Sequence, residues 1–170
     1  MCGIAQESYR SHAVCIFDWL THKRGFVMGT KSSIDQLNSF LRGEMSAVET
    51  YRMAIDKLDA ASTARAELLV NLKSHQDRVM MLQDAIIAVG GTPAKSSGPW
   101  GTFAKAVEGT AKTLGDKMTV SALEEGEDHG LKDYKKDIDK LDIESRGIVA
   151  QLLPQQQQTH DRLSALKRRL

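Results

Sequence analysis

The sequence has few cysteines, prolines and aromatic residues. Of its 170 residues, two are cysteine, three are proline and 5% are aromatic. Cys2 and Cys15 both lie before Met28, so no disulfide framework holds the rest of the chain, and we expect a reducing, cytoplasmic location. No apolar run approaches the roughly 18 residues that a membrane-spanning helix needs, so we predict no membrane partner.

The chain also lacks an excess of charge of one sign. Lys plus Arg number 23 and Asp plus Glu number 22, which gives a net charge of +1. Proteins that bind nucleic acids or anionic membranes usually carry a basic excess, so we expect neither partner. No phosphate-binding loop, Ser-His-Asp order, zinc-type cysteine pairing or dinucleotide fingerprint is present. The composition is that of a single soluble domain.

Apolar residues spaced three and four apart predict a first pair of α-helices. The first helix begins near Ser33, which forms a capping-box pattern with Gln36, and continues to about residue 58. The second covers about 63–89 and ends at Gly90-Gly91, because Pro93 cannot continue it. Only a few residues join these two helices, so we expect a helical hairpin.

The same spacing predicts a second pair of helices over about 119–141 and 144–167. Pro154 must either kink the last helix or mark its true start. Residues 90–116 form a long connection between the two pairs, and we expect it to contain a short helix from about Trp100 with Phe103 and Val107 facing inward. One long crossover between the second and third helices is typical of ferritin-like bundles, whereas up-down-up-down bundles have only short loops.

We therefore predict an all-α protein with two domain regions. Residues 31–168 form a ferritin-like four-helix bundle, and residues 1–30 form a loose N-terminal extension with a short helix over about 7–20. A second interpretation is that natural synthesis begins at Met28, just ahead of the first helix signal.

An internal repeat relates the two helix pairs. Residues 43–59 and 126–142 share eight identities in 17 aligned positions at a constant offset of 83, including Glu44 with Glu127 and Tyr51 with Tyr134. Leu68-Leu69 and Asp77-Arg78 then match Leu152-Leu153 and Asp161-Arg162 at an offset of 84. Two packed copies of one hairpin would place the two glutamates at the same depth, facing one central space.

Glycine precedes each of these glutamates. Gly43 and Gly126 each weaken a helix by roughly 1 kcal/mol relative to alanine. We expect them to allow the helices to approach closely beside the acids.

Three short motifs give the sequence a family resemblance. The segments are His75-Gln76-Asp77-Arg78, Gly90-Gly91-Thr92-Pro93 and Gly101-Thr102-Phe103. With them, residues 33–167 resemble a small bacterial group of ferritin-like proteins known as a domain of unknown function. The resemblance implies a four-helix bundle of the ferritin-like superfamily, whose di-iron members use one Glu from each of two helices and a Glu-x-x-His from each of the other two.

This resemblance implies an incomplete ligand set. Glu44 and Glu127 match the single acids, and His75 and His160 match the two histidines, but Leu72 and Gln157 stand where the bridging acids belong. Two carboxylates cannot compensate the charge of two divalent ions, so the sequence does not support a full di-iron centre. One divalent ion, iron included, held by the two glutamates and one or both histidines is chemically reasonable.

A second interpretation needs no metal. The two acids can be paired with His75, Arg78 or a tyrosine hydroxyl of Tyr51 or Tyr134, in a polar network within the core. Aligning the two halves at offset 84 also places Thr159, not His160, opposite His75. The metal site and the network are therefore alternatives.

Three classes of function remain open. We expect a non-catalytic ferritin-like bundle with a degenerate or single-metal core site and no assigned catalytic residue, stress-associated by analogy with its fold. The first alternative is a carboxylate-bridged di-iron oxidase or iron-handling protein. The second is a protein-interaction module that pairs through exposed bundle faces, for example as a homo-oligomer.

Overall fold

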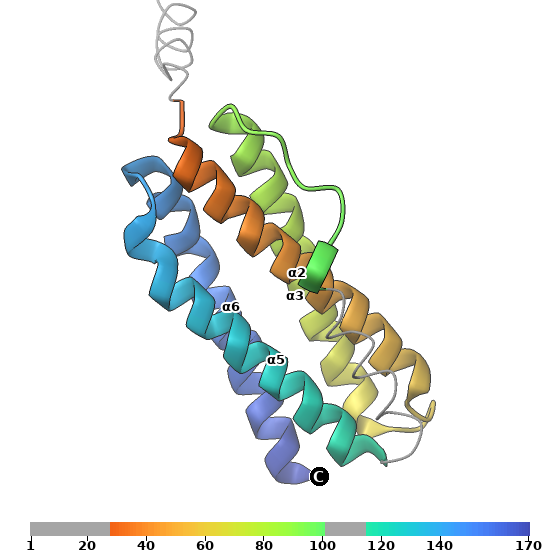
Figure 1. The fold of residues 1–170 in the computed structure, drawn as a ribbon. Helices are drawn as coiled ribbons and strands as arrows, with labels where there is room; N and C mark the ends of the chain where they lie inside the picture. Colours follow the sequence, from red (N-terminus) through yellow and green to blue (C-terminus); the bar gives the residue numbers. More distant parts are fainter. Residues whose placement is uncertain (1–27, 101–114) are drawn as a thin grey trace, which may run out of the picture.

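The computed structural model describes residues 28–100 and 115–170, and these form a four-helix bundle (Figure 1). The long helices are α2 (Lys31–Lys57), α3 (Thr63–Ala88), α5 (Gly115–Asp137) and α6 (Ile143–Arg169), with short 3₁₀ helices η1 (Gly98–Trp100) and η2 (Ile138–Lys140). The all-α class and the four helices are confirmed, and the described residues contain no strand. The short helix expected over 7–20, both cysteines, Phe103 and Val107 lie outside the described residues.

The helix directions follow the ferritin-like pattern. Helices α2 and α3 form one antiparallel hairpin, and α5 and α6 form the other. Helix α3 ends at the opposite end of the bundle from the start of α5, so the two run in the same direction (Figure 1). A connection between them must therefore cover the length of the bundle, as the long spacing between the second and third helices predicts.

Side-chain caps fix the starts of three helices. The hydroxyl of Thr30 accepts from the Ser33 amide at the start of α2, and Ser62 and Asp142 cap α3 and α6 in the same way. The prediction that Ser33 is the cap is wrong by three residues. Ser33 is instead buried, and its Oγ accepts from the Asp142 amide at 2.8 Å, which joins the starts of α2 and α6.

Glycine ends α3, whereas the proline within α6 does not interrupt that helix. Gly90 adopts a φ of 80° directly after the C-cap residue Val89, so α3 ends where the sequence predicts. Gly91 is required by close packing, because a Cβ there would lie 2.7 Å from Ile34 Cγ2. Helix α6 continues through Pro154, so this proline does not mark its start.

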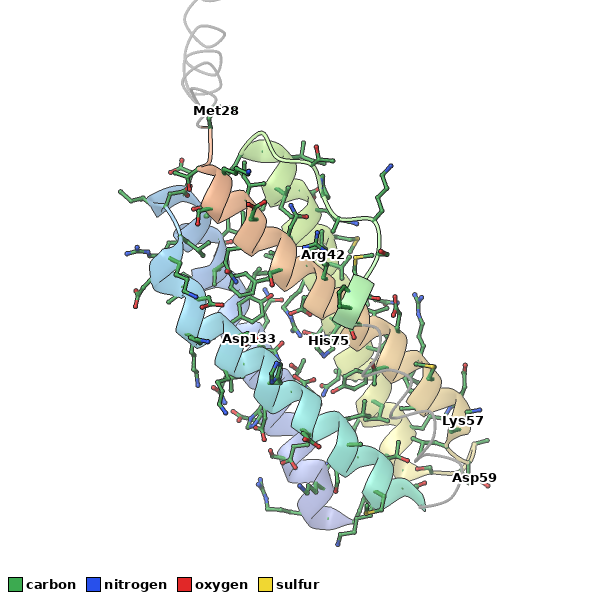
Figure 2. All side chains as sticks on the ribbon, viewed as in Figure 1. Met28, Arg42, Lys57, Asp59, His75 and Asp133 are labelled. Carbon is green, nitrogen blue, oxygen red and sulfur yellow. The ribbon has the colours of Figure 1, made fainter. Side chains whose placement is uncertain are left out.

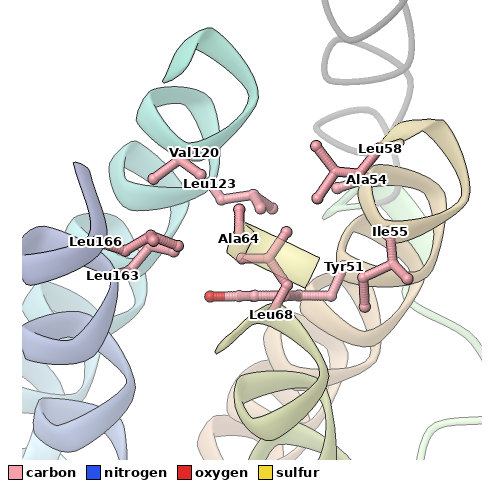
Figure 3. Close-up of a cluster of buried hydrophobic side chains, with 10 residues drawn as sticks. All are labelled: Tyr51, Ala54, Ile55, Leu58, Ala64, Leu68, Val120, Leu123, Leu163 and Leu166. Atoms are coloured by element: carbon pink, nitrogen blue, oxygen red, sulfur yellow. The ribbon is translucent and has the colours of Figure 1, made fainter. Parts of the chain in front are cut away.

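Two apolar clusters form the core, one toward each end of the bundle. One cluster surrounds Tyr51, Leu68, Leu123 and Leu163 (Figure 3). The other contains residues of all four helices and the loop ends near them: Leu37, Phe40, Leu41, Leu82, Ile86, Val89, Tyr134, Leu141, Val149 and Leu152. Burial of these side chains supplies the main driving force for helix association. The buried charged residues lie between the two clusters along the helices.

Candidate functional site

Two buried glutamates face the same histidine in the middle of the bundle. Glu44 on α2 and Glu127 on α5 are 4% and 2% exposed. His75 on α3, labelled in Figure 2, lies between them, with Nδ1 at 2.8 Å from Glu44 Oε2 and Nε2 at 2.8 Å from Glu127 Oε1. The stripe positions of the sequence therefore bring these three predicted residues together, and the imidazole bridges the two carboxylates directly.

Arg78 adds a second buried cation, one helical turn beyond His75. Its side chain is fully buried, and its Nε donates to Glu44 Oε1 at 2.9 Å. Its terminal nitrogens donate to Ser74 Oγ at 2.9 Å and to Gln156 Oε1 at 2.7 Å, and Nη2 also lies 2.7 Å from His75 Nδ1. Arg78 thus binds Glu44 Oε1, whereas His75 contacts the other carboxylate oxygen, Oε2.

Each tyrosine of the repeated motif donates to the glutamate of the other hairpin. Tyr51 on α2 donates to Glu127 Oε1 at 2.5 Å, and Tyr134 on α5 donates to Glu44 Oε1 at 2.9 Å. The two bonds are equivalent under the offset of 83 that the sequence shows. They connect α2 with α5 in both directions across the core.

Helix α6 completes the hydrogen bonding of Glu127. Gln156 Nε2 and Thr159 Oγ1 donate to Glu127 Oε2 at 2.8 and 2.9 Å. Asn71 on α3 donates to Tyr51 Oη at 3.1 Å and to the Thr159 carbonyl at 3.0 Å. We call Glu44, His75, Arg78, Glu127, Gln156 and Thr159 the polar layer.

Burial and charge act in opposite directions on the acids of the polar layer. Burial alone would raise the pKa of Glu44, but the positive charges of Arg78 and His75 outweigh it and lower the pKa to about 2. The pKa of Glu127 is also lowered, because the charge and hydrogen bond of His75 and the Tyr51 hydroxyl outweigh the burial that would raise it. Both acids are therefore carboxylates at neutral pH.

The bases and tyrosines shift in the complementary direction. Burial lowers the pKa of His75, but the charges of Glu127 and Glu44 outweigh burial and Arg78, so the pKa lies above its ordinary value. Burial, followed by the neighbouring carboxylate, raises the pKa values of Tyr51 and Tyr134 well above the ordinary value, so both remain hydrogen-bond donors. The layer therefore sets two carboxylates against the fixed charge of Arg78 and an imidazole whose pKa is raised.

His160, the fourth predicted ligand, lies outside this layer. Its Nε2 is 2.7 Å from Asp128 Oδ1 and its Nδ1 is 3.0 Å from Asp161 Oδ1, while its side chain is 19% exposed. Thr159 takes the inward position, as the alignment at offset 84 indicates. A step of one residue rotates a side chain by about 100° around a helix, which explains why His160 lies outside the polar layer when Thr159 faces the core.

Comparison with known proteins places this chain in a family. A family model described as "Domain of unknown function (DUF2383)" matches residues 32–140. The chain belongs to this family. Among solved structures, it is similar to a chain described as "A Dodecameric Thioferritin in the Bacterial Domain, Characterization of the Bacterioferritin-Related Protein from Bacteroides fragilis". That match has a TM-score of 0.65 and 19% sequence identity over 88% of this chain and 91% of the other. No curated protein matches the chain.

The similarity to this ferritin-like chain confirms the ferritin-like fold expected for this member of DUF2383. The family match and this fold together confirm the resemblance to a ferritin-like domain of unknown function. The core residues can therefore be compared directly with the requirements of a ferritin-like metal centre.

The polar layer does not fit a dinuclear metal centre. Leu72 and Gln156 stand on the inward faces of α3 and α6, where bridging carboxylates would be needed. Both nitrogens of His75 contact carboxylates, so neither is free to bind a metal, and Arg78 places a fixed positive charge beside Glu44. In the two described ranges, no group of three or more His, Cys, Asp or Glu side chains is placed to hold a metal ion.

Sequence reasoning missed two members of the site. Gln156 was overlooked because the ligand pattern, when counted back from His160, gives Gln157. The offset of 84 would have found it, since it aligns Gln156 with the inward position Leu72. Asn71 is 1% exposed and lies three residues after Leu68 and four before His75, so the three-four spacing marks it as inward-facing, although the neighbouring Leu72 was assigned to the stripe in its place.

Proposed function

We propose that this protein is a non-catalytic ferritin-like bundle in which two side-chain cations replace the metal ions. The observation that carries the proposal is the imidazole of His75, which contacts both core carboxylates at 2.8 Å. Arg78 supplies the second positive charge at Glu44. The layer satisfies its own charges and stabilises the bundle without a cofactor.

Charge arithmetic supports this function over an iron oxidase. Two divalent ions bring a charge of +4, whereas the layer offers two carboxylates that are already matched by two cations. Admitting metal would require His75 and Arg78 to lose their partners in a buried site, which is costly. The ferritin-like fold alone does not supply the missing acids.

Metal analysis of the purified protein tests this proposal. The protein is produced in medium supplemented with iron, manganese and zinc, purified without chelator, and analysed by mass spectrometry for metal per chain. We expect far less than one equivalent, and no oxygen uptake on addition of Fe²⁺ beyond that of Fe²⁺ in protein-free buffer. Two irons per chain, lost in Glu44→Ala and in Glu127→Ala, would establish the oxidase alternative instead.

A single divalent ion remains the alternative for the same residues. One equivalent of metal that is lost in His75→Ala would favour it. His160→Ala is the matched control, because His160 is the remaining predicted ligand and lies with Asp128 and Asp161. Loss of metal in both variants would require α6 to rotate so that His160 turns into the core.

Self-assembly is a second candidate function, favoured by the surface of α3. Leu69, Met80 and Ile87 are 47%, 54% and 59% exposed. At about 100° per residue their directions around the helix agree to within about 20°, so they lie on one face of α3, where Lys73 and Gln76 separate Leu69 from Met80. The thioferritin with the similar fold is described as dodecameric, which supports the expectation that copies of this chain associate.

Sedimentation velocity tests the assembly. We expect the wild-type protein to sediment as an oligomer and Met80→Lys to shift it toward the monomer. Ile143→Lys is the control, because Ile143 is 85% exposed but lies at the start of α6. A monomeric wild type at all concentrations would contradict this function and leave the metal-free core unaffected. A stress-associated role and a cytoplasmic location also remain predictions.

A further inference from the structure

A cavity of about 320 Å³ lies between α2 and α5 and reaches the polar layer. Its inner end is formed by Glu44, His75 and Glu127 together with the rings of Tyr51 and Tyr134. A cavity of about 150 Å³ already holds a benzene molecule, so this one has room for a substituted ring or for two fused rings. Neither the metal-free core nor self-assembly accounts for it.

Small residues line the cavity from both helices. Gly43 and Ala47 lie on α2, and Gly126 and Gly130 lie on α5. A Cβ at Gly43 would meet no atom within 4 Å, so neither close packing nor a positive φ requires glycine there. The expectation that Gly43 allows close helix approach is therefore wrong. Because Gly43 and Ala47 both line the cavity, larger side chains at these positions would reduce its volume.

The start of the long crossover borders the cavity. Pro99 of η1 is among the lining residues, and η1 packs against α2 (Figure 1). Two side chains of α2 hold this segment in place. Asn38 donates to the Thr92 carbonyl at 3.1 Å. Glu49 accepts from the Ser97 hydroxyl at 2.9 Å. The wall that Pro99 supplies is therefore already in position without a ligand, as is usual for small-molecule sites.

The polar groups at the inner end of the cavity already have hydrogen-bond partners. The two carboxylates, both nitrogens of His75 and both tyrosine hydroxyls bond to one another. Gln156 accepts from Arg78 and donates to Glu127. In the described ranges, the buried side-chain atoms without a partner belong to residues that do not line the cavity: Asn71, Asp137, Ser145 and Arg162. A charged ligand group at the inner end would therefore lose its water without finding an unpaired partner, which is costly.

The outer end of the cavity offers no paired site for a charge either. Glu125 and Asp133 line it from α5, but they lie eight residues apart, which is about 12 Å along a helix. Asp133 Oδ2 also lies 3.7 Å from His129 Nε2. None of the described lining residues is Lys or Arg, so an anionic ligand would meet acids at both ends. The lining therefore disfavours ligands of either charge.

The wall between the outer and inner ends is aromatic. Phe40 and Tyr134 stack with their ring centroids 4.6 Å apart and planes at 13°, and both line the cavity. Tyr51 and Leu123 add further apolar surface. Aromatic rings pack favourably against one another in stacked or edge-to-face arrangements, so this wall suits an aromatic ligand.

We propose that this cavity binds an uncharged aromatic molecule, either one ring with a short substituent or two fused rings. The ring packs against Phe40 and Tyr134, and the burial of its apolar surface drives binding. The ligand does not compete for the hydrogen bonds of the polar layer, because those groups already satisfy one another. The site requires neither a metal nor a second copy of the chain.

Binding of three probes of similar size tests the proposal. Benzyl alcohol, benzylammonium and benzoate share one ring and differ in charge, and NMR titration of the full chain gives their dissociation constants. We expect benzyl alcohol to bind with a dissociation constant of about 1 mM or lower. Benzylammonium should bind at least about three-fold and benzoate at least about ten-fold more weakly, because each charge must be desolvated. Shifts caused by the alcohol should concentrate on residues of α2 and α5.

Variants of α2 locate the binding. Ala47→Leu should fill the cavity and abolish binding of benzyl alcohol. Ala150→Leu is the matched control, because Ala150 is exposed on α6 and does not line the cavity, and it should leave the affinity unchanged. Gly43→Leu provides a second filling variant one turn away, where a Cβ meets no atom, and it keeps the test decisive if Ala47→Leu does not fold.

Several outcomes would overturn the proposal. They are a charged probe that binds as tightly as the alcohol, no saturable shift with benzyl alcohol up to about 10 mM, or binding that survives a filling variant in a folded protein. Each is independent of metal content, so a metal-free protein that binds no aromatic probe would leave the proposed function standing.

Discussion

Replacing Arg78 with methionine is the most direct test of the polar layer. The Arg78 side chain is fully buried and donates to Glu44, Ser74 and Gln156 at 2.7–2.9 Å. Methionine would preserve much of its volume but would leave the Glu44 carboxylate with one cation fewer in a buried site. Breaking a buried ion pair in this way costs about 3–5 kcal/mol. A typical domain has about 5–15 kcal/mol of stability in total.

Urea unfolding followed by circular dichroism measures this loss. Arg162→Met is the matched control, because Arg162 is the counterpart of Arg78 in the second repeat. Its side chain is 32% exposed, and its guanidinium reaches Glu67 at 3.6 Å. We expect this control to lose less than about 1 kcal/mol, as exposed ion pairs do.

A double-mutant cycle separates the ion pair from the packing of the arginine. Glu44→Gln combined with Arg78→Met should cost less than the sum of the single variants, by about 1–3 kcal/mol. If Arg78→Met costs no more than Arg162→Met, or if the two single losses add, then Glu44 and Arg78 are not energetically coupled and a stabilising role for their ion pair is refuted.

Three further results are expected. Because the pKa of Glu44 is lowered from 4.5 to about 2, its stabilisation is present above pH 4.5 and is lost as the pH falls toward 2; that of His75, whose pKa is raised, is present below pH 6.5 and is lost at higher pH. The urea midpoint should therefore fall as the pH drops below 4.5 and as it rises above 6.5. Glu44→Gln should make the fall at acid pH shallower, and an unchanged fall would contradict the assignment of the lowered pKa to Glu44. Gly43→Ala should stabilise α2 by about 0.5–1 kcal/mol, since its Cβ meets open space, while Gly130→Ala should gain less because its Cβ lies 3.1 Å from Gln156 Nε2; thermal melts compare them, and a loss in Gly43→Ala would show that the space is occupied. Tyr51→Phe should cost about 1–3 kcal/mol in the same unfolding assay, because Glu127 and Asn71 each lose a partner, and a neutral result would indicate that the hydroxyl is solvated in the native state.

The helices and the depth of the site residues could be predicted from the sequence. Apolar spacing fixes which face of a helix is buried, and polar residues within that stripe, such as Glu44 and His75, must then lie in the core. The offset of 84 between the repeats also predicted part of the site, since it indicated that Thr159 rather than His160 faces inward. Caps were predicted less well, because Thr30 and Ser33 are both suitable N-cap residues and only the tertiary contact of Ser33 with Asp142 decides between them.

Other features depend on distances between helices, which no periodicity specifies. The presence of both Arg78 and His75 at Glu44 requires α2 and α3 to be aligned to within part of a turn. Gly43 and Gly126 line a cavity between α2 and α5, and a Cβ at Gly43 would meet no atom within 4 Å. The sequence shows the small residues, but it does not show whether a glycine brings two helices together or leaves room between them.

The position of the polar layer has a consequence for how the four helices are aligned along the bundle. Within the described ranges, every buried charged side chain belongs to this one level: Glu44, His75, Arg78 and Glu127. Sliding α2, α3 or α5 by a single turn, about 5.4 Å, would move a charge out of this level and into one of the apolar clusters on either side, and sliding α6 would remove Gln156 and Thr159 from Glu127. Neighbouring leucines are interchangeable in such a slide, but the ionic contacts are not. The layer therefore fixes the axial register of the helices, because a shift of one turn in either direction would break its ionic contacts.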